Sequence, residues 1–187
     1  MPQTPLRTDR LELVPLSDEH IELEVELDAD ALVLRYLHPR ARTRDEVVAK
    51  HAERMKCASL VDGLGMWIGF TRAQQREFVG LWMLQPLHGP SQTFAPDEAD
   101  LGYRLLRRWW RQGYASEGAR ELIRHGFDDL GLTRIIAQTM AVNRPSRATM
   151  ETLGMRFART FHEHYDEPLP GVEHGEVEYE LRRSDWL

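Results

Sequence analysis

The stretch ADLGYRLLRRWWRQGYASEG (residues 99–118) joins a strand-like segment to a glycine-containing loop and then to a helical pattern. Its first eight residues predict a strand, and apolar residues from Ala119 to Leu130 recur at helical spacing. Gly131 then follows as a typical residue beyond a helix C-terminus. A strand, a glycine loop and a helix in this order are an arrangement that binds phosphate groups.

The loop can hold an anion through its main chain. The first N–H groups of a helix have no partner within the helix, and the helix adds about half a positive charge there. Gly113 lets the backbone approach an anion without an intervening Cβ, and Arg107, Arg108 and Arg111 add full charges. Known nucleoside-triphosphate and dinucleotide motifs do not fit the glycine spacing. From this stretch alone, a surface loop with packed tryptophans is an equal alternative.

Composition narrows the class of protein. The chain has 187 residues, with 30 acidic and 24 basic side chains and a net charge of −6, so bulk nucleic-acid binding is not expected. Its one cysteine, Cys57, allows no internal disulfide. No apolar run approaches the ~20 residues that cross a bilayer, and the N-terminus lacks the apolar core of a signal peptide. We expect a cytoplasmic protein with neither membrane nor nucleic-acid partners.

Alternating and helical patterns predict a mixed fold. Helices are expected to begin at Ser17, at the Thr43–Glu46 capping box and at Asn143, which caps a short helix through Leu153. The expected strands are 10–16, 65–73, 77–87, 99–106, 134–142, 155–165 and 175–183. The order predicts an α/β (α+β) fold, with a mixed central sheet of about seven strands and helices on both faces. The segment 99–142 should form a parallel crossover.

Residues 99–157 resemble the GCN5-related N-acetyltransferases (GNAT), in particular the RimJ/RimL-like branch. RQGYASEG (111–118) is similar to the branch's G-x-G-Y-A-x-E-A loop. Asn143 and Ser146, followed by ETLGM (151–155), are similar to its N-x-x-S…E-K-L-G-F helix. The segments TDRLELVPL and EYELRRSDW resemble the two ends of the branch. The resemblance implies a single GNAT acetyltransferase domain over residues 1–187, with acetyl-CoA as co-substrate and no metal.

The resemblance also implies where acetyl-CoA binds. Its pyrophosphate would sit on the amides of Gln112 to Ala115, and its pantetheine arm would pair along strand 99–106 like an added strand. A backbone N–H near Leu105 or Leu106 would polarise the thioester carbonyl. The predicted cofactor-binding residues are Leu105, Leu106, Arg107, Arg108, Arg111, Gln112, Gly113, Tyr114, Ala115, Ser116, Asn143 and Ser146.

The implied acceptor is an amine, either a protein N-terminus or a small molecule. Deprotonation at pH 7 costs about 4.6 kcal/mol for a lysine-type amine, but only about 1 kcal/mol for an α-amino group. A carboxylate can therefore serve as base, and Asp100 and Glu98 are the candidates. Asp100 is preferred because relatives often carry a carboxylate just before Leu-Gly-Tyr. An ordinary surface acid is the alternative for each.

Two positions depart from the family pattern. Trp110 stands where the loop usually has Gln or Arg, and Met150 replaces the tyrosine that protonates the leaving thiolate in many relatives. Ser146 is the alternative proton donor. These departures keep open a second hypothesis, a GNAT-fold module that binds acyl-CoA without turnover.

Other candidate sites have weaker signals. His162 and His164 share one strand face and, with Asp166, Glu167 and His174, could form a metal site or line the acceptor pocket. Neither is the favoured interpretation.

Aromatic, thiol and edge features also have ordinary interpretations. Trp67 and Trp82 on neighbouring strands could form a pocket wall, although core packing is preferred. Cys57 is not expected to be a nucleophile. An exposed strand edge would allow a homodimer.

Overall fold

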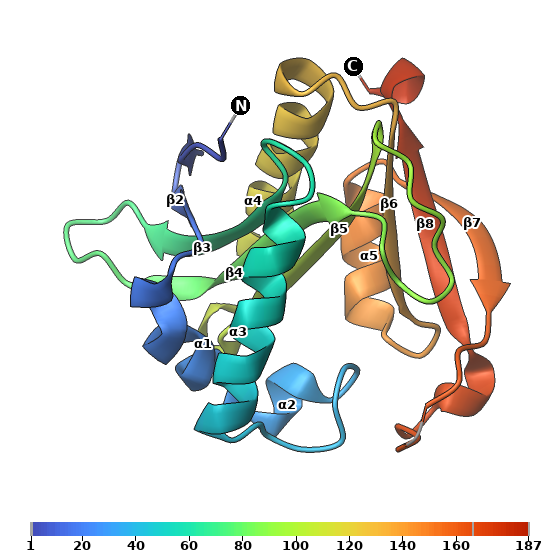
Figure 1. Cartoon of the computed structure of the whole chain (residues 1–187), viewed down its shortest axis with the longest axis horizontal. Helices are drawn as coiled ribbons and strands as arrows, with labels where there is room; N and C mark the ends of the chain where they lie inside the picture. Colours follow the sequence, from blue (N-terminus) through green and yellow to red (C-terminus); the bar gives the residue numbers. More distant parts are fainter. Residues whose placement is uncertain (1, 166, 187) are drawn as a thin grey trace.

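A single mixed sheet forms the centre of the protein (Figure 1). The structure is a computed structural model that describes residues 2–165 and 167–186, and within them the sheet has eight strands in the order β1-β2-β3-β4-β5-β6-β8-β7. The strands are β1 (Leu6–Arg7), β2 (Leu11–Pro15), β3 (Gly65–Thr71), β4 (Phe78–Pro86), β5 (Glu98–Leu105), β6 (Arg134–Met140), β7 (Arg156–Phe161) and β8 (Glu176–Arg182).

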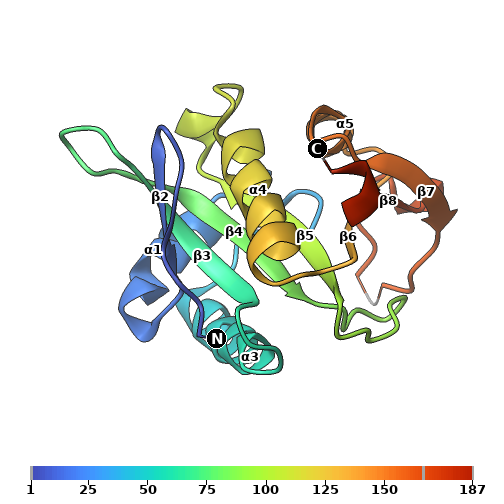
Figure 2. The same cartoon turned by 90° about the horizontal axis from the view of Figure 1, so that it is seen from above.

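Helices cover both faces of the sheet (Figures 1 and 2). On one face lie α1 (Ile21–Asp28), α2 (Ala31–Leu34) and α3 (Arg44–Ala58); on the other lie α4 (Tyr114–Arg124) and α5 (Arg144–Thr152). Successive residues of a strand point to opposite faces of the sheet, and an apolar core lies on each face. Leu101 of β5 packs in the core under α4, whereas Ile68 of β3 packs in the core under α1. The predicted mixed sheet between two helix layers is confirmed.

Helix starts follow the local signals in the sequence. Thr43 and Glu46 form the predicted capping box, with the Glu46 carboxylate 2.7 Å from the Thr43 amide. Asn143 accepts a hydrogen bond from the Ser146 N–H at 3.4 Å and so caps α5. The sheet has one short strand more than expected, β1, and the strand predicted over 155–165 ends at Phe161.

The two central strands β5 and β6 separate after a short contact. Their parallel ladder contains three pairs, Glu98–Arg134, Ala99–Ile135 and Asp100–Ile136. The antiparallel ladder between β5 and β4 continues to Leu105. The remainder of β5 therefore has a strand partner on one side, and Figure 1 shows the two strands diverging. We call this opening, bounded by residues 101–105 and 137–140, the fork.

A buried ionic cluster ties the helices α1 and α3 to the sheet. Asp28 of α1 is fully buried and accepts from Arg42 at 3.0 Å and from Arg104 of β5 at 2.6 Å. Glu24, one turn earlier, pairs with Arg54 and His51 of α3. Burial lowers the pKa of Arg104 to about 10, although the charge of Asp28 opposes this. The cluster fixes these helices over the face to which Asp100 also points.

Asp28→Asn should destabilise the fold strongly, because it leaves buried guanidinium groups without their counter-charge. We expect a loss of about 3–5 kcal/mol in the free energy of unfolding, measured by urea denaturation. The matched control is Asp45→Asn, an exposed carboxylate in the first turn of α3, where the loss should be about 0.3–1 kcal/mol. Equal losses in the two proteins would contradict a structural role for the cluster.

Candidate active site

The N-terminus of α4 presents free backbone amides next to the fork. Gly113 has a φ of 82° and Arg111 a φ of 57°, so the loop turns sharply before the helix begins. The Glu117 N–H donates to Gly113 O at 3.0 Å, which closes the first helical turn. The amides of residues 114–116 precede this hydrogen bond and therefore have no acceptor within the helix.

Arg10 and Glu117 fasten this helix end to the strand β2. The Glu117 carboxylate accepts from the Arg10 amide at 2.9 Å, from Arg10 Nε at 2.6 Å and from Thr8 Oγ1 at 2.5 Å. Arg10 also donates to Gln112 O at 3.0 Å, and its guanidinium lies 4.3 Å from the centre of the Tyr114 ring. Burial would raise the pKa of Glu117, but these hydrogen bonds outweigh it and hold the pKa below its ordinary value. Arg10 was not predicted as a site residue from the sequence, although it lies in the segment TDRLELVPL that resembles the family.

The three loop arginines do not behave alike. Arg107 pairs with Asp30 at the start of α2, and Arg108 pairs with Glu26 of α1 at 3.0 Å. In the part of the chain that the structure describes, Arg111 has no ion pair. Arg107 and Arg108, which were predicted to bind the pyrophosphate, therefore also bind the α1–α2 segment. Arg111 has no such ion pair among the described residues.

Backbone groups on one edge of β5 point into the fork. Leu106 N–H donates to Val79 O of β4 at 3.0 Å. Because antiparallel ladders alternate, the backbone groups of Leu105 and Tyr103 point the other way, toward β6. The N–H of Leu106 is thus occupied by β4, whereas the N–H of Leu105 points into the fork and can donate to a ligand there. Trp110 Nε1 donates to Leu105 O at 2.7 Å, which gives this departure from the family pattern a structural role at the end of the strand.

A tyrosine and a serine meet across the fork on the α4–α5 side. The Tyr103 hydroxyl of β5 donates to Ser146 O at 3.2 Å and lies 3.4 Å from Ser146 Oγ. Burial raises the pKa of Tyr103, so the phenol is protonated at neutral pH. Met150 is 2% exposed and packs in the core, as an apolar side chain should. Tyr103 joins Ser146 as a candidate proton donor. It was not predicted from the sequence, although it belongs to the segment Leu101-Gly102-Tyr103.

The candidate base Asp100 lies at the vertex of the fork, on the opposite face. It occupies the last β5–β6 pair and is buried, and Gln92 Nε2 donates to its Oδ2 at 3.0 Å. Burial raises the pKa of Asp100 to about 6, against the opposing effect of this hydrogen bond. The other candidate, Glu98, is paired with Arg134 at 2.8 Å. Asp100 is therefore the carboxylate without an arginine partner at this point.

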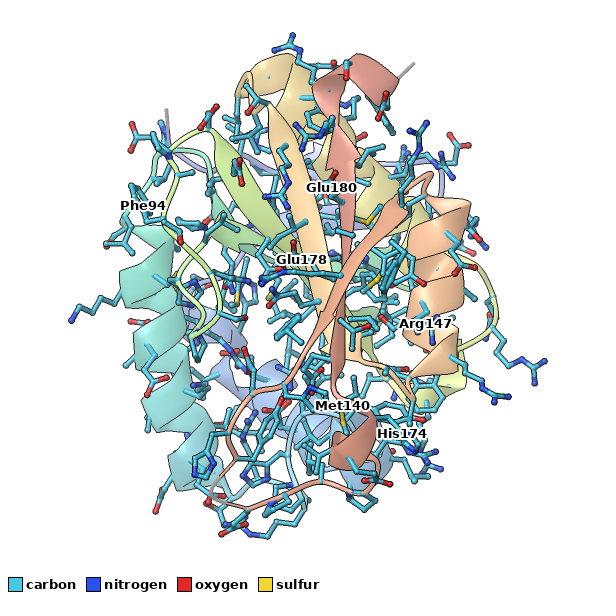
Figure 3. All side chains as sticks on the ribbon, turned by 90° about the vertical axis from the view of Figure 1, so that its right-hand side faces the viewer. Phe94, Met140, Arg147, His174, Glu178 and Glu180 are labelled. Atoms are coloured by element: carbon cyan, nitrogen blue, oxygen red, sulfur yellow. The ribbon has the colours of Figure 1, made fainter. Side chains whose placement is uncertain are left out.

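A cavity of about 590 Å³ lies on the same face, and Gln92, which donates to Asp100, is one of its lining residues. Glu178 of β8 borders it and pairs with Arg134 at 3.0 Å and Arg159 at 2.8 Å. Figure 3 views this side, with Glu178 among the strands and Phe94 on the loop before β5. The cavity is lined by Leu87, Ser91, Gln92, Thr93, Phe94, Ala95, Glu98, Arg134, Ile136, Ala158, Arg159 and Glu178.

Several weaker candidates lie elsewhere. Among residues 2–165 and 167–186, no three His, Cys, Asp or Glu side chains gather as metal ligands. Asp166 of the suggested cluster lies outside the described residues. His174 instead borders a second cavity of about 470 Å³ beside Arg144 and Arg147 (Figure 3).

Trp67 and Trp82 have structural roles, and the surroundings of Cys57 do not favour a catalytic one. Trp67 and Trp82 are fully buried, so core packing is confirmed. Trp82 Nε1 donates to Ala115 O at 3.1 Å, and a Cβ on Gly118 would lie 2.5 Å from the Trp82 ring, so the indole fits directly beneath α4. Burial and the charge of Asp100 raise the pKa of Cys57, which disfavours a thiolate nucleophile.

Comparison with known proteins identifies the class. The sequence matches the acetyltransferase (GNAT) domain family over residues 10–156, and the chain belongs to this family. A curated relative from Aspergillus fumigatus, described as an FsC-acetyl coenzyme A-N(2)-transacetylase, is 43% identical over 188 residues, covering 99% of this chain and 79% of that protein.

Two solved structures share the fold. A GNAT-family acetyltransferase from Bacillus anthracis superposes with a TM-score of 0.75 at 21% identity, covering 96% of this chain and 99% of the other. RimL, a ribosomal-protein α-N-acetyltransferase in complex with coenzyme A, gives 0.75 at 17% identity, covering 95% and 97%. The GNAT fold and family predicted from the sequence are confirmed. The protein is an acetyl-CoA-dependent N-acetyltransferase. Among the described residues, the helices are too short or too polar to span a membrane.

Glu117→Gln should reduce stability in a pH-dependent way. Because the pKa of Glu117 is depressed in the folded protein, its ionisation favours folding at neutral pH, and this contribution is lost as pH falls through the folded-state pKa. The difference in unfolding free energy from the unsubstituted protein should be largest near pH 7 and shrink below pH ~4. Urea denaturation between pH 3 and pH 7 measures it. The exposed Glu19→Gln is the control; a pH-independent difference at Glu117 would refute the assignment.

Proposed function

We propose that the protein acetylates a primary amine at the fork, with Asp100 as the general base. The observation that carries this proposal is a buried carboxylate without an arginine partner at the vertex of the fork. It lies on the sheet face opposite α4, whose N-terminus presents the amides suited to a pyrophosphate. The two reactants would thus approach the vertex from opposite faces.

The proposed cofactor position uses the free edge of β5. The pyrophosphate of acetyl-CoA lies on the amides of Gln112 to Ala115, and Arg111 supplies a charge. The pantetheine arm runs into the fork, where the unpaired amides of Tyr103 and Leu105 offer strand-like hydrogen bonds. An N–H directed into the fork at Leu105 can stabilise the negative oxygen that develops on the thioester carbonyl. Asn143, at the end of β6, borders the other side of this opening.

The proposed reaction needs one proton acceptor and one proton donor. Asp100 takes a proton from the acceptor ammonium, and the free amine attacks the thioester carbon. The C–S bond then breaks, the thiolate takes a proton from the Ser146–Tyr103 pair, and the second proton of the attacking nitrogen restores that pair. Asp100 afterwards releases its proton to solvent. With an Asp100 pKa of about 6, the proton transfer is uphill by about 2 kcal/mol from an α-amino group but by about 6 kcal/mol from a lysine-type amine.

The acceptor we propose is therefore an α-amino group. The name of the relative from Aspergillus fumigatus specifies an N(2) nitrogen, which in an amino acid is the α-amino nitrogen. The lower pKa of an α-amino group supports the same acceptor, because its deprotonation costs less than that of a lysine-type amine. The cavity of about 590 Å³, which Gln92 separates from Asp100, offers room for the remainder of such an acceptor.

Asp100→Asn should lower kcat/KM for an α-amino acid amide by about 10²–10⁴-fold, the usual contribution of a general base. In the unsubstituted protein kcat/KM should fall below pH about 6, because the ionised carboxylate is the active form. Release of free CoA thiol measures the rate, and calorimetry of acetyl-CoA binding verifies the fold. Glu98→Gln is the comparison; the larger loss there would transfer the role of base to Glu98.

Gly113→Val should weaken acetyl-CoA binding by about tenfold or more, since it places a side chain where the pyrophosphate approaches the backbone. Gly154→Val is a matched control, because Gly154 has a φ of 83° against 82° at Gly113, and nothing lies within 4 Å of its added Cβ. Both substitutions place a side chain at a similar positive φ, and the added Cβ at Gly113 also lies 3.3 Å from Arg10 Nη2, the mobile end of a long side chain. Calorimetry should show weaker binding for Gly113→Val alone, and equal affinities would exclude the pyrophosphate position.

A further inference from the structure

The Asp100 carboxylate is held by a loop side chain. Gln92 lies in the segment 87–97 between β4 and β5, and its Nε2 donates to Asp100 Oδ2 at 3.0 Å. The same Nε2 donates to Gln138 Oε1 at 3.1 Å. Because Asp100 belongs to β5 and Gln138 to β6, one amide group spans the fork on the face opposite α4.

The orientation of the Gln92 amide is determined by its other end. Its Oε1 accepts from the His88 N–H at 3.0 Å and from the Gly89 N–H at 2.9 Å. A flipped amide would place its NH₂ group against these two donors. The nitrogen must therefore face Asp100 and Gln138, and both of its hydrogens are used.

A closed ring of contacts keeps the amide in place. Gln138 donates to Glu178 Oε2 at 2.8 Å, and Arg159 Nη2 donates to the same oxygen at 2.8 Å. Arg159 Nη2 also donates to Ser91 O at 3.1 Å, and Ser91 directly precedes Gln92. The ring returns to the loop from which it started, so Gln92 has little freedom to turn away from the carboxylate.

We infer that Gln92 is a positioning residue for acetyl transfer, which holds the Asp100 carboxylate ionised at the vertex. The inference rests on the proposed function, in which Asp100 is the base. An N–H donor favours the charged form of a carboxylate, and a buried carboxylate without one favours the protonated form. Two other titratable side chains act on the pKa of Asp100: His88 lowers it, and Glu178 raises it. Cys57 of α3 also faces this carboxylate. The Gln92 variants leave these three residues unchanged.

The test is the pH profile of kcat/KM for an α-amino acid amide in two variants. Gln92→Met removes the N–H donors at similar length, whereas Gln92→Glu keeps an acceptor for His88 and Gly89 but places a second carboxyl group at Asp100. The acid limb should move to higher pH in the order unsubstituted, Met, Glu. The ratio of variant to unsubstituted kcat/KM should be roughly fivefold or more lower at pH 6 than at pH 8.5. Taking this ratio cancels the titration of the acceptor amine.

Thr133→Val is the control for the loop alone. Thr133 Oγ1 donates to Asp97 Oδ2 at 2.7 Å and so anchors the far end of the same segment, away from Asp100. The ratio of kcat/KM for Thr133→Val to that for the unsubstituted protein should be independent of pH. A pH-independent ratio for both Gln92 variants, with Asp100→Asn inactive, overturns the role of Gln92 and leaves the proposed base intact. A fully active Asp100→Asn protein overturns both.

Discussion

The parallel ladder between β5 and β6 stops after three residue pairs, and the candidate active site depends on this limit. Because the ladder ends at Asp100 and Ile136, the rest of β5 offers unpaired amides within the sheet instead of at its rim. The N-terminus of α4 follows the end of β5, and that of α5 follows the end of β6. Both helix starts and the strand edge therefore gather around one opening.

Two contacts span that opening, one on each face of the sheet. Tyr103 reaches Ser146 on the α4–α5 face, and Gln92 joins Asp100 to Gln138 on the other. The chemistry of the two faces differs accordingly. One face offers N–H and hydroxyl donors, which suit phosphate and a leaving thiolate, whereas the other offers a carboxylate, which suits an ammonium group.

Local signals were sufficient for much of the fold. The Thr43 capping box, the Asn143 cap and the strand alternation each depend on residues within a few positions of one another, and all were predicted. β1 has two residues and α2 four, which is too short for a periodic pattern to be recognised. Asp100 was selected on its place before Leu-Gly-Tyr, and the structure adds its burial and its position at the vertex.

The remaining site features depend on contacts between distant residues. Arg10 and Glu117 are separated by 107 positions, and Tyr103 and Ser146 by 43, so no spacing rule connects them. Arg107 and Arg108 were assigned by charge alone, and only the fold shows that they pair with α1 and the start of α2. Trp110 could not be interpreted until the direction of the Leu105 carbonyl was known.

The fork has a further consequence for how the free protein behaves among its own copies. Unpaired strand amides on an outer rim are templates for β-aggregation, and proteins normally cover or shorten such edges. Here the unpaired amides of β5 lie between two strands of one sheet, with α4 and α5 packed over one face. A strand from another molecule would have to enter through an opening bridged on both faces. The protein thus keeps unpaired strand amides available to a ligand without placing them on an outer rim of the sheet.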